Sequence, residues 1–304
     1  MTFKAAVIQD SPVLFNLKLT IDKVETLTKE ASRNGASLVV FPEAFISAYP
    51  KGLVFGAKIG SRTLKGRKEF LQYYNSSLDL NSSEFRKLLN IAKNNKVFLV
   101  IGVIEKSSGT LYCTILHISD KGSLLCKHRK VMPTAAERLV WGFGDGSTLE
   151  TAKTRLGVLG SVICWENYMP MMRMSMYDQG IELYCAPTAD DRETWISTVK
   201  HIALEGRCFV FSSCQFFTKA DYPSEFDISN IVGDEPIMKG GSCIISPLGK
   251  VLASAGNKKR AIIYSEINLN EIIQGKYDFD VVGHYSRPDI FKLIVNKKSK
   301  KPVI

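Results

Sequence analysis

The feature that most constrains the fold is an alternation of short apolar segments with longer amphipathic ones. Residues 37–41 are apolar and rich in β-branched side chains, and Pro42 ends the run, which is typical of a strand buried on both faces. Residues 16–34 carry apolar side chains at helical spacing, and Gly35 suits the end of a helix. Strands and helices mixed in this way predict an α/β or α+β protein.

The same alternation extends to residue 267 and predicts the remaining elements. Helices are expected over residues 83–94, 169–179 and 191–206. Strands are expected over residues 3–9, 97–105, 111–119, 156–164, 181–186, 208–214, 241–246, 250–253 and 261–267. No low-complexity linker divides the 304 residues, which fit one large domain.

Composition argues against several classes of protein. The chain is 45% hydrophobic and 23% charged, which is ordinary for a globular protein. No apolar run reaches the roughly 18 residues of a membrane span, and no signal-peptide pattern follows Met1. The seven cysteines are odd in number and include no C-x-x-C pair, which favours free thiols in a reducing compartment. We therefore expect a cytoplasmic protein with no membrane partner.

The net charge of +10 raises the question of a nucleic-acid partner. The excess is local, however, and no basic stripe carries interleaved aromatic residues. A solvated tail and a turn explain the charge better than a nucleic-acid site does, and they hold Lys297, Lys298, Lys300, Lys301, Lys258, Lys259 and Arg260. The four histidines show no metal-ligand spacing, so we expect no metal and no cofactor.

Three segments place a reactive side chain beside a turn-like sequence. Glu43 directly follows the predicted strand 37–41, Cys164 ends the predicted strand 156–164, and Lys130 lies in His128-Arg129-Lys130. Loops at strand ends are where open α/β sheets collect active sites. Each residue alone also has an ordinary structural explanation, as a capping carboxylate, a surface lysine or a buried thiol. Spacing alone does not bring the three together.

Together, these segments resemble the three signature regions of the nitrilase superfamily, the carbon–nitrogen hydrolases. The resemblance runs from about residue 4 to residue 288. The family's glutamate falls on Glu43, its lysine on Lys130, its nucleophilic cysteine on Cys164 and its second glutamate on Glu137. This extent predicts one hydrolase domain over residues 1–288 and a short basic tail over residues 289–304.

The sequence around these residues is more similar to nitrilases than to amidases or carbamoylases. The similar stretches are Phe41-Pro42-Glu43-Ala44 through Gly52, residues 128–147, Cys164-Trp165-Glu166-Asn167 through Pro170, and Gly283-His284-Tyr285-Ser286-Arg287-Pro288. Residues 212–239 match the family poorly, and the tail beyond Leu293 is short and basic. These departures concern assembly and substrate range and leave the four motif residues intact.

The resemblance implies a four-layer α-β-β-α sandwich of two face-to-face sheets with helices outside. It implies homodimers that extend the sandwich and build larger homo-oligomers or spiral filaments, with the helix over residues 169–179 as a candidate dimer surface. The implied activity is that of a hydrolase of carbon–nitrogen bonds other than peptide bonds. Its most specific form is a nitrilase that converts a small-molecule nitrile to the carboxylic acid and ammonia. An aliphatic amidase or carbamoylase and a catalytically silent scaffold are the alternatives.

The implied mechanism assigns a role to each motif residue. Glu43 takes the proton from Cys164, whose thiolate attacks the nitrile carbon to give a thioimidate and then a thioester. Lys130 stabilises developing negative charge, and Glu137 lies near Lys130 or the leaving ammonia. The Trp165 amide is a second donor if the chain turns sharply after Cys164. Substrate-binding candidates, which are equally consistent with core aromatics, are Tyr49, Trp165, Tyr168 and Trp195.

Overall fold

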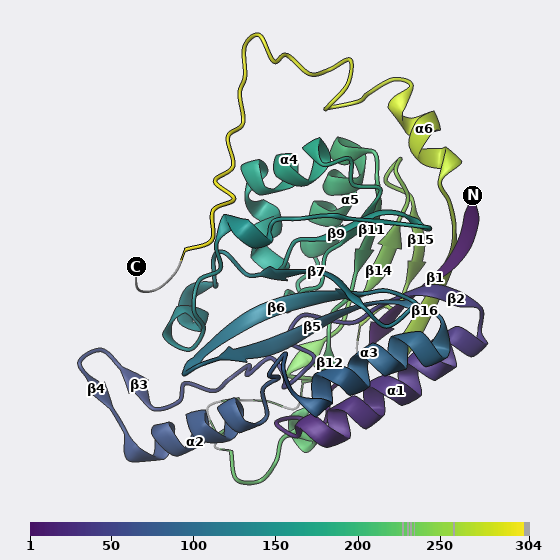
Figure 1. The fold of residues 1–304 in the computed structure, drawn as a ribbon. Helices are drawn as coiled ribbons and strands as arrows, with labels where there is room; N and C mark the ends of the chain where they lie inside the picture. Colours follow the sequence, from purple (N-terminus) through teal and green to yellow (C-terminus); the bar gives the residue numbers. More distant parts are fainter. Residues whose placement is uncertain (227, 230, 232, 234, 258, 301–304) are drawn as a thin grey trace.

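The computed structural model describes residues 1–226, 228–229, 231, 233, 235–257 and 259–300. Two six-stranded sheets form its centre (Figure 1). Sheet one has the order β16 (Ala261–Asn268), β1 (Thr2–Gln9), β2 (Ala36–Val40), β5 (Phe98–Ser107), β6 (Thr110–Ile118) and β7 (Leu124–Arg129). Sheet two has the order β15 (Val251–Ser254), β14 (Cys243–Ile245), β11 (Phe209–Ser212), β10 (Leu183–Cys185), β9 (Gly157–Ser161) and β8 (Ala152–Thr154).

Both sheets have the same plan. Three central strands run parallel, β1-β2-β5 in sheet one and β9-β10-β11 in sheet two, and the outer strands pair antiparallel. Parallel strands are buried on both faces, which explains their continuous apolar sequences. Their carboxyl ends lie at one edge of each sheet, where the functional loops leave.

Alternating side chains of the strands fill two different layers of core. In β1, Ala5 and Val7 point into the layer between the sheets, where they join residues of sheet two such as Leu183 and Phe211. Ala6 and Ile8 point to the other face, toward Ile21 and Val24 of α1 (Leu17–Arg33) and Leu88 and Ile91 of α3 (Ser83–Asn95). This two-residue alternation follows from strand geometry. The helices α1 (Leu17–Arg33) and α3 (Ser83–Asn95) therefore cover sheet one.

The outer face of sheet two is covered in the same way by α4 (Pro170–Asp178) and α5 (Trp195–Gly206). Tyr184 and Val210 from the sheet, and Val162 just after β9, pack with Met176 and Ile202 from these helices. Figure 1 shows the resulting layers, with α1 and α3 on one outside and α4 and α5 on the other. The four-layer α-β-β-α sandwich expected from the sequence is confirmed.

Local signals account for the helix ends. The Asn16 side chain accepts a hydrogen bond from the Leu19 N–H at the start of α1, and Ser82 does the same for Phe85 at the start of α3, as N-caps do. Gly35 follows α1 with a φ of 87°, a conformation that glycine adopts without steric cost. These ends lie within one residue of those that the sequence predicts.

Several predicted boundaries were wrong. β9 ends at Ser161, three residues before Cys164, because the chain leaves the sheet before the turn that carries the thiol. α5 begins at Trp195, four residues later than predicted, because residues 191–194 form part of a turn in which Arg192 pairs with Asp190. The elements missed were α2 (Leu64–Asn75), α6 (Asn270–Lys276), β7, β8 and the short pairs β3 (Ala57–Lys58)/β4 (Ser61–Arg62) and β12 (Phe216–Phe217)/β13 (Met238–Lys239). β7 was missed because its half-buried side chains do not alternate between apolar and polar.

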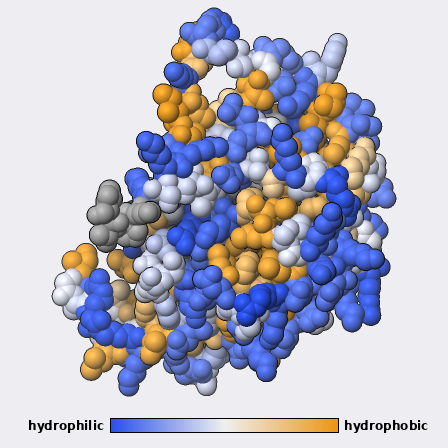
Figure 2. All heavy atoms as spheres, viewed as in Figure 1, coloured by the Kyte–Doolittle hydropathy of each residue, from blue (hydrophilic) through white to orange (hydrophobic). Residues whose placement is uncertain are grey.

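After α6 the chain runs as a long extended arc past α4 and returns to the loop at Asp145 (Figure 1). The Lys300 N–H donates to Asp145 Oδ2 at 2.7 Å, and Val295 packs against the core cluster that includes Met172 and Met176 of α4. Figure 2 shows apolar side chains along this arc, of which Ile294 is 78% exposed. Lys297, Lys298 and Lys300 are exposed, whereas Lys258 and Lys301 lie outside the described residues. Within the described part of the chain, no helix is long and apolar enough to cross a membrane.

Candidate active site

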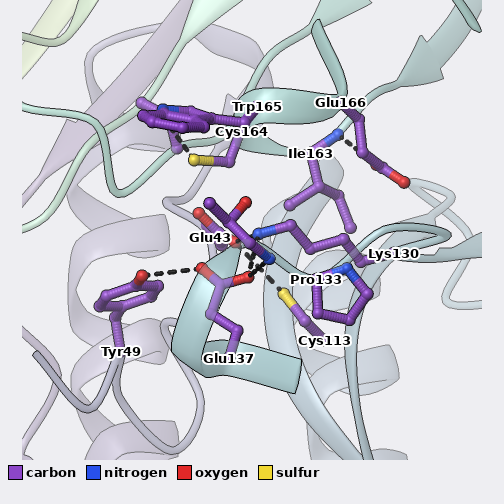
Figure 3. A network of polar contacts seen from close by, with 12 residues as sticks. Glu43, Tyr49, Cys113, Lys130, Pro133, Glu137, Ile163, Cys164, Trp165 and Glu166 are labelled. Carbon is purple, nitrogen blue, oxygen red and sulfur yellow. Dashed lines mark hydrogen bonds and ion pairs between the residues drawn. The ribbon is translucent and has the colours of Figure 1, made fainter. Parts of the chain in front are cut away.

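The four motif residues lie on loops that leave the two sheets. Glu43 follows the central strand β2, and Lys130 comes directly after β7, so both leave sheet one. Cys164 follows β9 of sheet two. Glu137 lies on the short 3-10 helix Ala135–Leu139, which follows Lys130. Face-to-face packing of the sheets brings these loops together (Figure 3).

Lys130 lies between two carboxylates. Its Nζ is 2.7 Å from Glu43 Oε1 and 2.7 Å from Glu137 Oε2, and only 1% of the residue is exposed. Its ammonium also lies 5.6 Å from the ring centre of Trp141, within the range of a cation–π contact. A lysine buried this deeply needs such partners to remain charged.

Three hydrogen bonds fix the Glu137 carboxylate. The Tyr49 hydroxyl donates a hydrogen bond to Oε1 at 2.7 Å, and the Thr134 N–H donates one to Oε2 at 2.6 Å. Lys130 donates to the same Oε2. The Thr134 contact is half of a capping box, because Glu137 is the third residue of the helix that Thr134 caps. The prediction that Glu137 lies near Lys130 is met by this geometry.

Cys164 begins a sharp turn. Its φ is 50°, a left-handed conformation uncommon for a residue with a side chain. It is the first residue of the 3-10 helix Cys164–Tyr168, whose first hydrogen bond runs from the Glu166 N–H to Ile163 O. The Trp165 N–H therefore lies before the first hydrogen bond of this helix and has no partner within the helix. The Cys164 N–H donates to Pro187 O at 2.9 Å, and the Cys164 sulfur accepts a hydrogen bond from the Thr188 hydroxyl at 3.3 Å.

Glu43 has one engaged and one free carboxylate oxygen. Oε1 accepts from Lys130 and, at 3.5 Å, from the Cys113 thiol. Oε2 is buried and has no hydrogen-bond partner among the residues that the structure describes. Figure 3 shows the Cys164 thiol and the Lys130 amino group approaching Glu43 from different sides. The Gln215 side chain fixes the backbone here by donating to Glu43 O at 2.7 Å.

Burial and charge shift the pKa values of these groups. Burial raises the pKa of Glu43 and outweighs the lowering by Lys130, which makes Glu43 a stronger base. Burial lowers the pKa of Lys130, but the surrounding groups, Glu43 first, outweigh this and raise it, so Lys130 stays charged. Burial, followed by the nearby Glu43 carboxylate, raises the pKa of the Cys164 thiol. The resting site therefore holds a protonated thiol beside a base.

Glu166 was not predicted from the sequence to have a role, although it lies in the motif after Cys164. Its Oε2 lies 2.9 Å from His128 Nε2 and 3.0 Å from the Ile163 N–H that donates to it. Its Oε1 accepts from the Val131 N–H at 2.6 Å. Burial raises its pKa, but His128, Lys130 and the Val131 N–H together outweigh burial and lower it. Glu166 thus holds the turn that carries Cys164 to the loop that carries Lys130, through contacts that the sequence does not reveal.

A cavity of about 200 Å³ opens onto the thiol. Larger hollows lie elsewhere on the surface, but this one joins Cys164 and Glu137. Its other lining residues are Tyr49, Thr134, Trp165, Ala189, Asp190, Asp191 and Arg192. Trp165 donates to Asp190 Oδ2 at 2.9 Å, and Lys51 pairs with Asp191 at 2.9 Å. The lining therefore combines an aromatic wall with paired charges.

Two of the four predicted substrate-binding residues line the cavity, and the other two lie behind Trp165 in a row of ring contacts. Tyr49 and Trp165 line the cavity. Tyr168 is half-exposed beside them, with its ring 5.9 Å from that of Trp165. Trp195 is buried and donates to Ser212 at 2.8 Å. In the described residues, no group of three or more histidine, cysteine or acidic side chains is arranged to hold a metal ion.

Comparison with known proteins identifies relatives over nearly the whole chain. A family model for carbon-nitrogen hydrolases matches residues 4–277. An aliphatic nitrilase of Sinorhizobium fredii is 50% identical over 99% of this chain and 98% of its own length. A bifunctional nitrilase/nitrile hydratase of Nicotiana tabacum is 50% identical over 99% of this chain and 88% of its own. A carbon-nitrogen hydrolase of Helicobacter pylori has a similar fold, with a TM-score of 0.76 and 20% identity, over 95% of this chain and 97% of its own.

Proposed function

The chain belongs to the carbon–nitrogen hydrolase family, in its nitrilase branch, and we propose on that basis that it hydrolyses an organic nitrile to the carboxylic acid and ammonia. The observation that carries the proposal is the site itself. Cys164 and Glu137 line one small cavity, and Lys130 lies 2.7 Å from both Glu137 and Glu43. A nitrile carbon is a weak electrophile, and this set supplies both a strong nucleophile and charge stabilisation.

In the first half of the reaction, Glu43 takes the Sγ proton and the sulfur electron pair forms a bond to the nitrile carbon. The unengaged Oε2 of Glu43 is the acceptor for that proton. The nitrile nitrogen gains a proton, and the product is a thioimidate on Cys164. Lys130 and the Trp165 amide stabilise negative charge as it develops, and loss of one such donor typically costs about 100-fold in rate or more.

In the second half, water adds to the thioimidate and the tetrahedral species expels ammonia, which leaves a thioester. A second water, activated by Glu43, attacks the thioester carbon and releases the carboxylic acid and the Cys164 thiol. Glu137 orients Lys130 and faces the departing ammonia. The tetrahedral species yields the amide instead if it expels sulfur before ammonia, so an amide by-product is compatible with the same site.

Two alternatives remain to be tested beside the nitrilase. An aliphatic amidase or carbamoylase uses the same residues on a C–N single bond. The two relatives described above are both named for nitrile chemistry, which favours the nitrilase. A catalytically silent scaffold would have no need for a buried base paired with a lysine beside a cavity that holds a thiol.

The deciding experiment measures ammonia, acid and amide from a panel of nitriles and the matching amides. Acid from nitriles that disappears in Cys164→Ala supports the nitrilase. Turnover of amides alone identifies an amidase or carbamoylase. No turnover of any compound, with Cys164 unreactive toward a thiol reagent, supports the scaffold.

The remaining parts of the proposal concern binding, assembly and location. Tyr49 and Trp165 line the cavity and therefore contact the nitrile. Tyr168 and Trp195, whose ring centres lie 5.9 Å apart, support that wall. Homodimers form through α4, where Met171 is 69% exposed, and build larger homo-oligomers or spiral filaments. The scattered cysteines favour the cytoplasm. Sedimentation and subcellular fractionation test assembly and location.

A further inference from the structure

We propose that Thr188 is a further catalytic residue, whose hydroxyl donates the hydrogen bond that stabilises the Cys164 thiolate. The inference rests on the proposed role of Cys164 as the nucleophile. Thr188 Oγ1 lies 3.3 Å from Cys164 Sγ, within hydrogen-bond distance for sulfur. The residue is fully buried, so no solvent molecule competes for this contact at its surface.

The position of Thr188 is fixed by the sheet. It lies three residues after β10, the central strand of sheet two, and its N–H donates to Ser213 O at 2.9 Å. The preceding residue, Pro187, accepts the Cys164 N–H at 2.9 Å. Thr188 and Cys164 therefore leave neighbouring parallel strands side by side, with backbone hydrogen bonds on both sides of the contact.

A second hydrogen bond sets the direction of the hydroxyl proton. The Asp190 N–H donates to Thr188 Oγ1 at 2.9 Å. An amide N–H only donates, so this bond occupies a lone pair of the oxygen and leaves its single proton to be donated elsewhere. Among the described residues, Cys164 Sγ is the acceptor that receives this proton. The Asp190 turn thus holds Thr188 as a donor toward sulfur.

The surroundings of the thiol explain why such a donor matters. When the Sγ proton passes to Glu43, negative charge forms on sulfur in a buried site. The Lys130 ammonium is already shared between Glu43 and Glu137. The Thr188 hydroxyl has no net charge and keeps its proton across the working pH range. It stabilises the thiolate as it forms before attack, and again when the thioester C–S bond breaks and the electron pair returns to sulfur.

The test compares Thr188→Val with Thr188→Ser by the rate at which iodoacetamide alkylates Cys164 between pH 6 and 10. Valine keeps the shape and removes the donor, whereas serine keeps the donor and removes a methyl group. Mass spectrometry of the digested protein confines the measurement to the Cys164 adduct. We expect Thr188→Val to react about ten-fold more slowly at neutral pH, with a higher apparent thiol pKa, as the loss of a hydrogen bond to a charged group predicts. Thr188→Ser should match the wild type.

The proposal is overturned if Thr188→Val has the rate and pH profile of the wild type, or if Thr188→Ser is as slow as Thr188→Val. If the valine variant is unstable, Thr188→Ala removes the same donor without placing a second methyl group in the polar site, and supplies the same comparison. The readout requires no substrate. If the thiol pKa shifts in Thr188→Val but the wild type turns over no nitrile, the role of Thr188 is supported and the nitrilase is rejected. If the wild type turns over nitriles but the thiol pKa does not shift, the nitrilase is supported and the role of Thr188 is rejected.

Discussion

At the scale of single residues, the site depends on how one buried positive charge meets two negative ones. Lys130 contacts Glu43 and Glu137 at 2.7 Å each, and none of the three side chains is more than 8% exposed. The attraction between these charges offsets the free-energy cost of burying them only while all three are present. Lys130 therefore has a role in stability as well as in the proposed chemistry.

We expect Lys130→Met to lower the free energy of unfolding by about 3–5 kcal/mol, because it leaves two buried carboxylates without their shared cation. Lys127→Met is the matched control. Lys127 contacts Glu105 from a side chain that is 27% exposed, and Arg129 holds the same carboxylate, so its loss should cost less than about 1 kcal/mol. Urea unfolding at pH 7 measures both, and equal losses would contradict the argument.

A second residue-scale prediction concerns Cys113, a thiol in contact with the base. Its S–H donates to Glu43 Oε1 at 3.5 Å, and a donor to a carboxylate favours the charged form. Cys113→Ala removes the donor, so the pKa of Glu43 should rise further and the acidic limb of the kcat/KM profile should move to higher pH. Cys113→Ser should restore the limb. An unmoved limb in Cys113→Ala, with activity retained, would show that the contact has no effect on Glu43.

At the scale of elements, the turn after β9 and the loop after β7 are joined by one carboxylate. Glu166 accepts from Ile163 on the turn, and from Val131 and His128 on the loop and strand. These contacts hold the nucleophile of one sheet against the lysine of the other. Positioning of this kind is demanding, because a displacement of 1 Å can cost about 100-fold in rate.

Glu166→Gln replaces one acceptor oxygen with an NH2 group that cannot accept from an amide. We therefore expect kcat to fall about 100-fold with a smaller change in KM, as measured by steady-state ammonia release. Glu182→Gln is the control, since Glu182 accepts from the Val158 N–H at 2.8 Å near the opposite end of β9. Similar effects of the two substitutions would indicate general loss of structure.

The same elements show how far the sequence leads. Pro42 marks the end of β2, so the place of Glu43 after a buried strand follows from local chemistry. The turn at Cys164, with its φ of 50°, does not, because distant parts of the chain hold it: Pro187 accepts the Cys164 N–H, and His128 and Val131 contact the Glu166 carboxylate. The family resemblance supplied the four motif residues. Thr188 and Glu166 remained hidden because the partner of Thr188 depends on which strands are neighbours in sheet two, and the partners of Glu166 depend on how the two sheets pack.

At the scale of the whole molecule, the two sheets are joined by a polar contact inside the apolar layer. His117 on β6 places Nε2 2.7 Å from Ser161 Oγ on β9, and its Nδ1 lies 3.4 Å from the Cys126 thiol. The ring is only 1% exposed. Burial, followed by the nearby His128, lowers the pKa of His117 to about 4. The folded protein therefore holds this histidine neutral at pH values where the unfolded chain protonates it.

This difference predicts a specific loss of stability in acid. Above pH 6.5 the histidine is neutral in both states and has no effect, whereas between pH 6.5 and about 4 only the unfolded state gains the proton. The free energy of unfolding should therefore fall with pH across that window, by about 3 kcal/mol in total from this group. His117→Gln removes the titration but keeps hydrogen-bonding capacity. Urea unfolding at pH 7, 5.5 and 4.5 should give the wild type a steeper decline than the variant. Parallel declines would mean that other groups, such as buried carboxylates, set the acid sensitivity of the sandwich.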